Sequence, residues 1–258
     1  MTAYVSKLAN PDGRYAYTAE EHAIWGTLFN RQIAALDGKM APDFLRGVSN
    51  LGLTDQSVPQ VVEVNARLSA LTGAGVVGVP ALIAPAQFFA LLATRKFPVA
   101  TFLRRREDID YIEEPDIFHE VFGHCPLLTD PDYAAFIENF GRRAAELGER
   151  YKWRMFRLFW FTVEFGMIRT DKGIRGFGAG IASSPAEAAH ATGGRADMLA
   201  FDLLTVFRTP YRIDIVQPVY FVIDSFAQLA AALDTDVGAV IDQAKRLGDL
   251  PARFDKAA

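Results

Sequence analysis

Residues 116–126 read DIFHEVFGHCP, and they contain two of the four histidines in this 258-residue chain, His119 and His124. Asp116 suits the N-cap of a short helix, and the Ile, Phe and Val residues between the polar positions supply its buried faces. Gly123, followed by a nearby proline, is typical of a helix end. The sequence therefore predicts a short helix with His119 inside it and His124 at its frayed end.

The spacing of the two histidines decides whether both imidazoles can reach one metal ion. Zinc proteases place two histidines at i and i+4, about 40° apart around a helix, whereas i and i+5 lie about 140° apart. A regular helix cannot aim both at one ion, but a backbone departure at Gly123 would turn His124 back toward the side of His119. Spacing alone leaves two interpretations open, a shared metal or two imidazoles hydrogen-bonded to the backbone at a helix end.

A carboxylate lies in a second, strongly apolar stretch, WRMFRLFWFTVEFGMIR, residues 153–169. We expect a helix here, with Glu164 on its apolar face. An ionised carboxylate in such a place requires either an arginine partner, Arg157 or Arg169, or a metal ion. Two histidines and one carboxylate hold one face of a non-haem Fe(II), and the same ligands with a bound water suit zinc.

Composition narrows the class of protein. Half of the residues are hydrophobic, 22% are charged, and the formal net charge is -4. These values exclude a disordered, collagen-like or polyanion-binding chain, and we expect no nucleic-acid partner. The single cysteine, Cys125, cannot form an intrachain disulfide, and the first twenty residues lack the apolar run of a secretion signal. We therefore expect a reducing, cytoplasmic location.

One segment must be tested against the membrane, because no Asp, Glu, Lys or Arg occurs between Arg67 and Arg95. That length reaches the roughly 20 residues of one bilayer crossing. Prolines and glycines within it would bend the chain and leave backbone groups unpaired in lipid. We expect a buried loop with a short helix here and no membrane partner.

Helical periodicity dominates the rest of the chain, so we predict a mainly α fold with short peripheral strands, in one domain that spans residues 1–258. Residues 1–14 are expected to form a flexible N-terminal segment. The expected helices are Ala19–Leu36, Val58–Leu71, Asp132–Glu149, Trp153–Ile168, Arg195–Phe207 and Ser225–Leu247. The expected strands are Val99–Leu103, Ile174–Phe177, Ile213–Val216 and Val219–Ile223.

Two further features have plain structural interpretations. The glycine-rich run from Gly173 to Ser184 lacks the lysine and the context of a nucleotide-binding loop, so we expect a tight hairpin or a close backbone approach to a ligand. Ser184, with Glu187 three residues later, predicts a helix N-terminus. Arg104 opens a cluster of three arginines whose simplest interpretation is a solvated turn.

Four segments, EEPDIFHEVFGHCPLL, WFTVEFG, GFGAGIASS and QPVYFVIDSF, occur in this order. In these segments the chain resembles the pterin-dependent aromatic amino acid hydroxylases, over about Tyr15 to Phe226. The resemblance implies a mainly helical catalytic domain, Fe(II) held by His119, His124 and Glu164, and tetrahydrobiopterin as the reductant. It also implies hydroxylation of L-phenylalanine to L-tyrosine with O2.

The resemblance also implies roles for residues around the iron. For the pterin, Phe88 would stack on the ring, and the other residues beside it would be Leu82, Ile83, Glu120 and Phe159. For the substrate, Arg104 matches the position that pairs with the amino acid carboxylate, and the further positions are Pro115, Trp160, Phe165, Ser183 and Ile213.

Several positions depart from the family pattern. Phe159 stands where the family usually has tyrosine, so a hydroxyl near the iron is absent. Ile112 occupies a position that is threonine in animal members. Ile213 stands where tyrosine-specific members have aspartate, which argues against tyrosine as the substrate. There is no room before Tyr15 for a regulatory domain, and nothing after Gly248 resembles the family's tetramerising coiled coil, so we expect a monomer without a separate regulatory domain.

Two alternative functions remain at this point. The first is hydroxylation of tryptophan by a member of the same family. The second is a zinc hydrolase that uses the same three ligands, with Glu120 as the general base. A helical binding module without enzymatic activity is the least specific interpretation.

Overall fold

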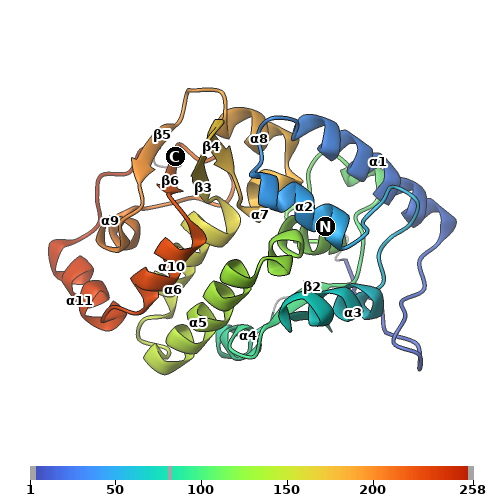
Figure 1. Ribbon diagram of the computed structural model, residues 1–258, viewed down its shortest axis with the longest axis horizontal. Coiled ribbons are helices and arrows are strands. Elements are labelled where there is room, and N and C mark those ends of the chain that lie inside the picture. Colours follow the sequence, from blue (N-terminus) through green and yellow to red (C-terminus); the bar gives the residue numbers. More distant parts are fainter. Residues whose placement is uncertain (1–3, 81–82, 255–258) are drawn as a thin grey trace.

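The computed structural model describes residues 4–80 and 83–254 and is mainly helical, with two small sheets (Figure 1). The predicted fold class is confirmed. The α-helices are α1 (Ala19–Ala35), α2 (Pro42–Asn50), α3 (Val61–Thr72), α4 (Pro85–Leu92), α5 (Pro131–Leu147), α6 (Lys152–Phe159), α7 (Ala179–Ser183), α8 (Pro185–Ala191), α9 (Leu203–Arg208), α10 (Phe226–Leu233) and α11 (Val237–Leu247). The short 3-10 helices are η1 (Arg106–Asp108) and η3 (Pro126–Thr129), and the π-helices are η2 (Phe118–His124) and η4 (Trp160–Glu164).

The strands form two separate sheets. In the first, β1 (Gly75–Val79) pairs in parallel with β2 (Lys96–Ala100), with α4 in the connection between them. In the second, the order is β4-β3-β6-β5, where β3 is Met167–Thr170, β4 is Gly173–Gly176, β5 is Asp197–Ala200 and β6 is Val219–Ile223. β3 and β4 form the tight antiparallel hairpin expected for the glycine-rich run, and β6 is buried along its whole length.

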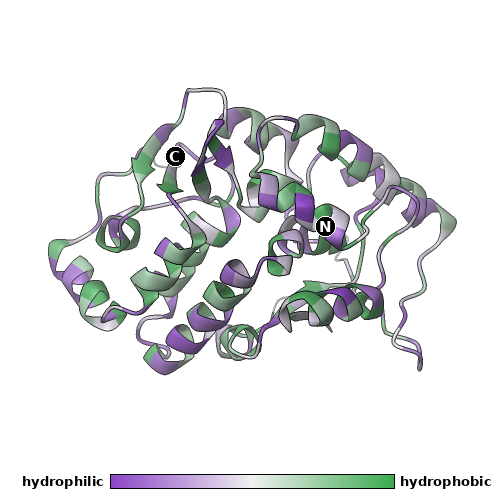
Figure 2. Cartoon of the chain, in the orientation of Figure 1, coloured by the Kyte–Doolittle hydropathy of each residue, from purple (hydrophilic) through white to green (hydrophobic). Residues whose placement is uncertain are grey.

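Helix α5 shows how the core is organised. Tyr133, Phe136 and Phe140 are spaced by three and four residues, and all three are buried. Hydrophilic and hydrophobic residues alternate along α5 and α11 (Figure 2). The apolar face of α5 packs against α4 and α10, and each large side chain buried there contributes about 1.5–3 kcal/mol. This central helix therefore connects the region of the first sheet to that of the second.

The predicted helices at α1, α3 and α5 are confirmed within a few residues, and two others are corrected. The helix expected over Trp153–Ile168 ends at Phe159 as an α-helix, widens into η4, and gives way to β3. The helix expected over Ser225–Leu247 is interrupted where Asp236 accepts a hydrogen bond from the Ala239 amide and starts α11. Periodicity carries across both breaks because the buried face continues.

Two other predictions are wrong. Arg195–Phe207 is not one helix, because Asp197–Ala200 pairs with β6 as a strand before Asp202 caps α9. Ile213–Val216 is not a strand. The side chain of Gln217 donates to the carbonyl oxygens of Arg212 and Ile215, so these groups bond to an amide rather than to a neighbouring strand.

The uncharged stretch between Arg67 and Arg95 contributes β1 and α4 to the fold, and the strand was not expected from the sequence. Among the described residues, no helix is both long and apolar enough to span a bilayer. The N-terminal segment, expected to be flexible, makes contacts at Tyr4–Lys7: Tyr4 stacks on Phe102, and Thr101 bonds to the Ser6 hydroxyl and the Lys7 carbonyl.

Candidate metal centre and aromatic pocket

The π-helix η2 brings the two histidines together. His119 Nε2 lies 3.1 Å from His124 Nε2. A π-helix has more residues per turn than an α-helix, so residues i and i+5 fall near one face, and the widening extends over the whole of Phe118–His124 rather than occurring as a bend at Gly123. Gly123 serves packing instead, because a Cβ there would lie 3.1 Å from Ala179 of α7. The two histidines converge as a shared metal would require, but the cause is the π-helix and not a backbone departure at Gly123.

Glu164, the last residue of the second π-helix, faces the same two imidazoles. Its Oε1 lies 3.2 Å from His124 Nε2, and its Oε2 lies 3.6 Å from His119 Nε2. Gly178 permits this arrangement, because a Cβ at that position would lie 2.2 Å from the Glu164 carbonyl oxygen. The glycine-rich run thus lies close to the backbone of Glu164, whereas a hairpin or a close approach to a ligand was expected from the sequence.

The two arginines considered as partners of Glu164 pair elsewhere. Arg157 binds Asp249, with an Nη1 to Oδ1 distance of 3.0 Å. Arg169 binds Asp224, with Nε to Oδ1 at 3.1 Å. The Glu164 carboxylate instead faces the two histidines, so the arginine alternative is wrong.

A second carboxylate, Glu120, flanks the cluster with its Oε2 4.0 Å from His124 Nε2. It belongs with His119 and His124 to a group of side chains close enough to hold a metal. Burial, reinforced by the charges of Glu164 and Asp116, raises the pKa of Glu120 well above its usual value. Burial also acts to raise the pKa of Glu164, but its interactions with His124 and His119 outweigh this and leave that pKa below its usual value. Glu164 lies within 3.6 Å of both imidazole Nε2 atoms, whereas Glu120 Oε2 lies 4.0 Å from that of His124, so Glu164 is the better placed metal ligand.

The hydrogen bonds of His119 determine its tautomer. The Ser183 hydroxyl donates to the Ala179 carbonyl oxygen at 2.8 Å, so its oxygen accepts the hydrogen of His119 Nδ1, also at 2.8 Å. Burial is the main reason that the pKa of His119 is lowered to about 4. A neutral imidazole with its hydrogen on Nδ1 presents the lone pair of Nε2 to the centre of the cluster, as a metal ligand must.

His124 is held by packing rather than by a polar partner. Its ring stacks on Phe97 with centroids 4.4 Å apart, and Phe159 lies 6.2 Å away. Its Nδ1 is buried and has no hydrogen-bond partner within residues 4–80 and 83–254. Phe97 was missed by sequence reasoning because a phenylalanine in a short apolar strand has no distinguishing signal.

The residues expected around the pterin lie beside this aromatic wall. The half-buried Phe88 has its ring 5.3 Å from that of Phe159, and Ile83 precedes its helix. Leu82 lies outside the described residues. Glu120 and Phe159 approach His124 from η2 and α6. The structure thus places Phe159 and Glu120 beside His124 and Phe88 beside Phe159.

Arg104, which is expected to bind the substrate, is buried rather than solvated. Its Nε and Nη2 donate to the two carboxylate oxygens of Asp116 at 2.8 and 2.9 Å. Asp116 also accepts the backbone N–H of His119 at 3.1 Å, so it acts as a cap as well as an ion-pair partner. Burial acts to raise the pKa of Asp116, but the charge and hydrogen bonds of Arg104 lower it overall. Pro115, half-buried, immediately precedes this pair.

A second group of aromatic side chains is formed by Trp160, Phe165 and Tyr211. Trp160 lies 4.6 Å from Phe165 and stacks on Tyr211 at 4.7 Å, measured between ring centroids. Ile213, expected near the substrate, is 72% exposed on the loop after Tyr211. Tyr211 was not singled out from the sequence, because loop aromatics carry no periodic signal.

Comparison with known proteins places this geometry in a family. Residues 2–243 match the family described as biopterin-dependent aromatic amino acid hydroxylase. The chain is 43% identical to phenylalanine-4-hydroxylase of Pseudomonas aeruginosa, covering 96% of this chain and 94% of that protein. It is 44% identical to phenylalanine-4-hydroxylase of Vibrio cholerae, covering 98% and 88%.

This chain belongs to the biopterin-dependent aromatic amino acid hydroxylases.

Solved structures of the family have the same fold. A phenylalanine hydroxylase from Legionella pneumophila superposes with a TM-score of 0.95 at 46% identity, covering 97% of this chain and 100% of that one. The Chromobacterium violaceum phenylalanine hydroxylase with bound oxidised Fe(III) gives a TM-score of 0.90 at 39% identity, covering 97% and 91%.

The donor atoms of this hydroxylase fit an iron ion. Two ligands bound at about 2.1 Å and at right angles to each other lie about 3 Å apart. The distances among His119 Nε2, His124 Nε2 and the Glu164 oxygens are 3.1, 3.2 and 3.6 Å. Two neutral imidazoles and one carboxylate on one side of a site form the ligand set of non-haem Fe(II) oxygenases, with the opposite side left open.

Proposed function

We propose that this protein hydroxylates the ring of L-phenylalanine at the para position to give L-tyrosine, with O2 and a tetrahydropterin as co-substrates. The convergence of His119, His124 and Glu164 within a family of biopterin-dependent hydroxylases carries the proposal. These three residues would hold Fe(II), and the relatives named above are phenylalanine hydroxylases. The iron and the pterin, when bound, supply the activation of O2.

Neighbouring residues hold His119, His124 and Glu164 in the orientation that metal binding requires. Ser183 fixes the His119 tautomer, and Phe97 holds the His124 ring in place. Phe88, Ile83, Leu82 and Phe159 would bind the pterin against this aromatic wall, with Glu120 beside it. A protonated Glu120 offers a hydrogen-bond donor to the pterin, in agreement with its raised pKa. Phe159 contributes only its ring, so no hydroxyl contact is made at that position.

Arg104 would bind the substrate carboxylate. Its pair with Asp116 occupies Nε and Nη2, which leaves the hydrogens of Nη1 for a second carboxylate. A guanidinium fixed on one edge is oriented before the substrate arrives, so little side-chain entropy is lost on binding. Pro115 adjoins this pair.

Trp160 and Phe165 would enclose the substrate ring, with Ser183 behind His119 and Ile213 at the exposed end of the pocket. Aromatic walls exclude water and favour a flat apolar ring. Tryptophan hydroxylation, the alternative within the family, is not favoured, because the relatives named above are phenylalanine hydroxylases. The zinc hydrolase interpretation is not favoured, because the relatives over nearly the whole chain are hydroxylases.

The test uses purified protein loaded with Fe(II) under air, with tetrahydrobiopterin and either L-phenylalanine or L-tryptophan. We expect tyrosine formation and O2 consumption that require iron, pterin and amino acid together, with phenylalanine preferred. Preference for tryptophan would select the family alternative. Activity that persists with zinc and without pterin would contradict the proposal.

We also propose that the catalytic unit is a monomer formed by one domain. The buried apolar residues from α1 to α11 form one continuous cluster, which supports a single domain. Light scattering coupled to size-exclusion chromatography should give a mass close to 28.5 kDa at micromolar concentration. A stable dimer or tetramer would contradict this part of the proposal.

A further inference from the structure

Gln217 is a buried amide at the end of the loop that follows α9. It is only 1% exposed, although glutamine usually lies at the surface. Its Oε1 accepts the indole N–H of Trp160 at 3.0 Å. Its Nε2 donates to the carbonyl oxygens of Arg212 and Ile215 at 3.0 and 2.8 Å. One side chain therefore joins the end of α6 to the loop at 211–216.

These bonds fix the orientation of the amide. Nε2 has two hydrogens, and both are used by carbonyl oxygens, while Oε1 faces a group that can only donate. A flipped amide would place the Nε2 hydrogens of Gln217 against the N–H of Trp160 and its oxygen against two carbonyls. The position therefore requires a side chain that accepts at one atom and donates twice at the other, which among the natural residues of this length only glutamine provides.

The backbone of Gln217 is anchored as well. Its N–H donates to Glu187 Oε1 at 3.1 Å, and the Tyr220 hydroxyl donates to the same oxygen at 2.5 Å. Glu187 is 5% exposed and Tyr220 is fully buried. Glu187 lies on α8 and Tyr220 on β6. Through Glu187, these two elements fix the backbone of Gln217 and thereby the position of its side chain relative to Trp160. A satisfied buried network of this kind is rigid and costly to break.

We propose that Gln217 is a positioning residue for the aromatic pocket, which it shapes by holding the Trp160 indole and the loop at 211–216 in one fixed relation. The amide bonds to Trp160 at one end and to the loop that carries Tyr211 at the other, so it also supports the stacking of Tyr211 on Trp160. Gln217 bonds to Trp160 and to this loop, so it would act on the substrate through Trp160 and determine how closely the site fits a six-membered ring against an indole. The inference rests on the proposed function for the meaning of selectivity, but not for the arrangement itself.

The first experiment measures the arrangement without iron or substrate. The three tryptophan indole N–H groups give separate signals in ¹⁵N-labelled protein, and Trp160→Phe assigns that of Trp160. Gln217→Met keeps the length of the side chain and removes its hydrogen bonds. We expect it to shift the Trp160 signal and to raise its hydrogen-exchange rate by about tenfold. The Trp25 indole, bonded to the Thr54 carbonyl at 2.8 Å, should be unchanged.

The second experiment measures selectivity in the iron-loaded enzyme. Gln217→Met should raise KM for phenylalanine by roughly three- to tenfold with a smaller change in kcat, and lower the preference for phenylalanine over tryptophan by at least about threefold. The matched control is Gln60→Met. The Gln60 amide also bonds to backbone on both sides, but at Tyr15, so this variant should keep the parent's selectivity.

Gln217→Glu provides a second variant with a different signature. An ionised carboxylate would face two carbonyl oxygens, whereas the protonated form can donate to one of them and still accept from Trp160. Its KM relative to the parent should therefore improve as pH falls, and this variant decides the matter if Gln217→Met fails to fold.

Three results separate the possible failures. An unshifted Trp160 indole in both variants would overturn the inference. A shifted indole with parental KM and selectivity would also overturn it, because the contact would then be structural only. A parent that does not hydroxylate phenylalanine would overturn the proposed function, while the indole measurement would still report on the arrangement.

Discussion

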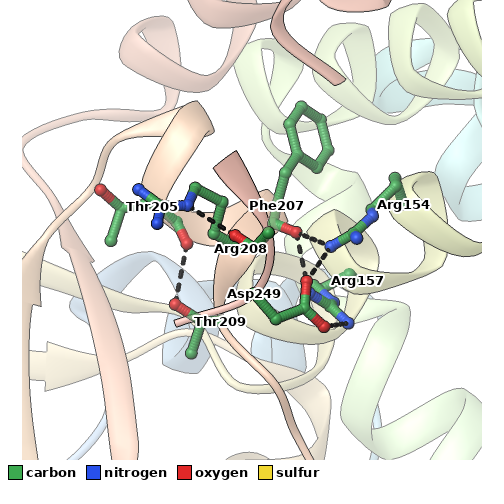
Figure 3. A network of polar contacts seen from close by, with 8 residues as sticks. Arg154, Arg157, Thr205, Phe207, Arg208, Thr209 and Asp249 are labelled. Carbon is green, nitrogen blue, oxygen red and sulfur yellow. Dashed lines mark hydrogen bonds and ion pairs between the residues drawn. The ribbon is translucent and has the colours of Figure 1, made fainter. Parts of the chain in front are cut away.

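Two arginine–aspartate clusters support this site, and they differ mainly in burial. In the first, the side chains of Arg104 and Asp116 are 8% and 0% exposed. In the second, Arg154 and Arg157 share Asp249, whose side chain is 41% exposed (Figure 3). Both clusters join separate segments of the chain through ion pairs between arginine and aspartate.

The surroundings of the two clusters give them different consequences. Asp116 accepts a hydrogen bond from the His119 backbone N–H, so the first pair directly fixes η2 and the two histidines on it. In the second cluster, Arg154 and Arg157 also donate to the Phe207 carbonyl, and Arg208 bonds to the Gly248 carbonyl, which ties α6, α9 and the chain after α11 together (Figure 3). Buried charges are costly when one partner is lost, whereas exposed pairs are weakened by water and salt. The first cluster should therefore be indispensable and the second replaceable.

The largest effect is expected from Asp116→Ala. It leaves the Arg104 guanidinium buried without a counter-charge and removes the cap on His119, so the free energy of unfolding should fall by about 3–5 kcal/mol. Urea unfolding of the metal-free protein, followed by circular dichroism, measures this. Asp249→Ala, measured in parallel, should cost much less. Equal losses in the two variants would show that burial does not separate the clusters.

Glu164→Gln should lower Fe(II) affinity by roughly tenfold or more, because an amide is a much weaker ligand than a carboxylate. Iron content at limiting Fe(II), measured by a chromophoric chelator, reports it. Arg157→Gln is the control from the exposed cluster, since Arg157 pairs with Asp249 and not with Glu164. Iron content equal to the parent in Glu164→Gln would remove this residue from the ligand set, and a loss in Arg157→Gln would show that the exposed cluster controls the metal.

The sequence predicted the types of the cluster residues well and their surroundings poorly. His119, His124 and Glu164 could be singled out because charged or imidazole groups in apolar stretches are rare. The two π-helices that align them could not be predicted from spacing, and neither could the packing of Gly123 against Ala179 or of Gly178 against the Glu164 carbonyl. Those contacts join residues far apart in the chain, where periodicity carries no information.

Arg104 and Gln217 show the same limit. Three consecutive arginines indicate a solvated turn, and only the fold reveals that Asp116, twelve residues later, buries the first of them. Gln217 follows residues whose polar and apolar side chains alternate as in a strand. Its side-chain amide bonds to the carbonyl oxygens of Arg212 and Ile215, which in a strand would bond to a neighbouring strand. Helices with a long amphipathic face, such as α5, were predictable because their burial is written in local spacing.

Arg104→Lys should have an intermediate effect. Lysine keeps the charge beside Asp116, so the protein should fold, but it cannot bind two carboxylates along fixed edges. KM for phenylalanine should rise by roughly tenfold, while kcat changes less. Steady-state kinetics at saturating pterin measures both, with Arg106→Lys as a control from the same cluster of arginines, because Arg106 lies 3.9 Å from the exposed Glu20. An unchanged KM in active Arg104→Lys would remove this residue from the substrate site.

The smallest effect is expected from Asp249→Asn, which retains the shape of the exposed cluster and removes its charge. The loss should be at most about 1 kcal/mol, or a few degrees in Tm, because surface pairs of this kind are partly screened by water. In 1 M salt, where the Debye length is about 3 Å, the difference from the parent should nearly vanish.

Burial acts to raise the pKa of Asp249, but the hydrogen bonds from Arg157 and Arg154 lower it overall, below the ordinary value of 3.8. The ionised form therefore stabilises the protein above that pH, and the stabilisation is lost as pH falls through the folded-state pKa. Thermal unfolding of parent and Asp249→Asn from pH 7 down to pH 3, at low and high salt, measures both dependences. A loss that is large, insensitive to salt, or greater at pH 3 than at pH 7 would place Asp249 in the same class as Asp116.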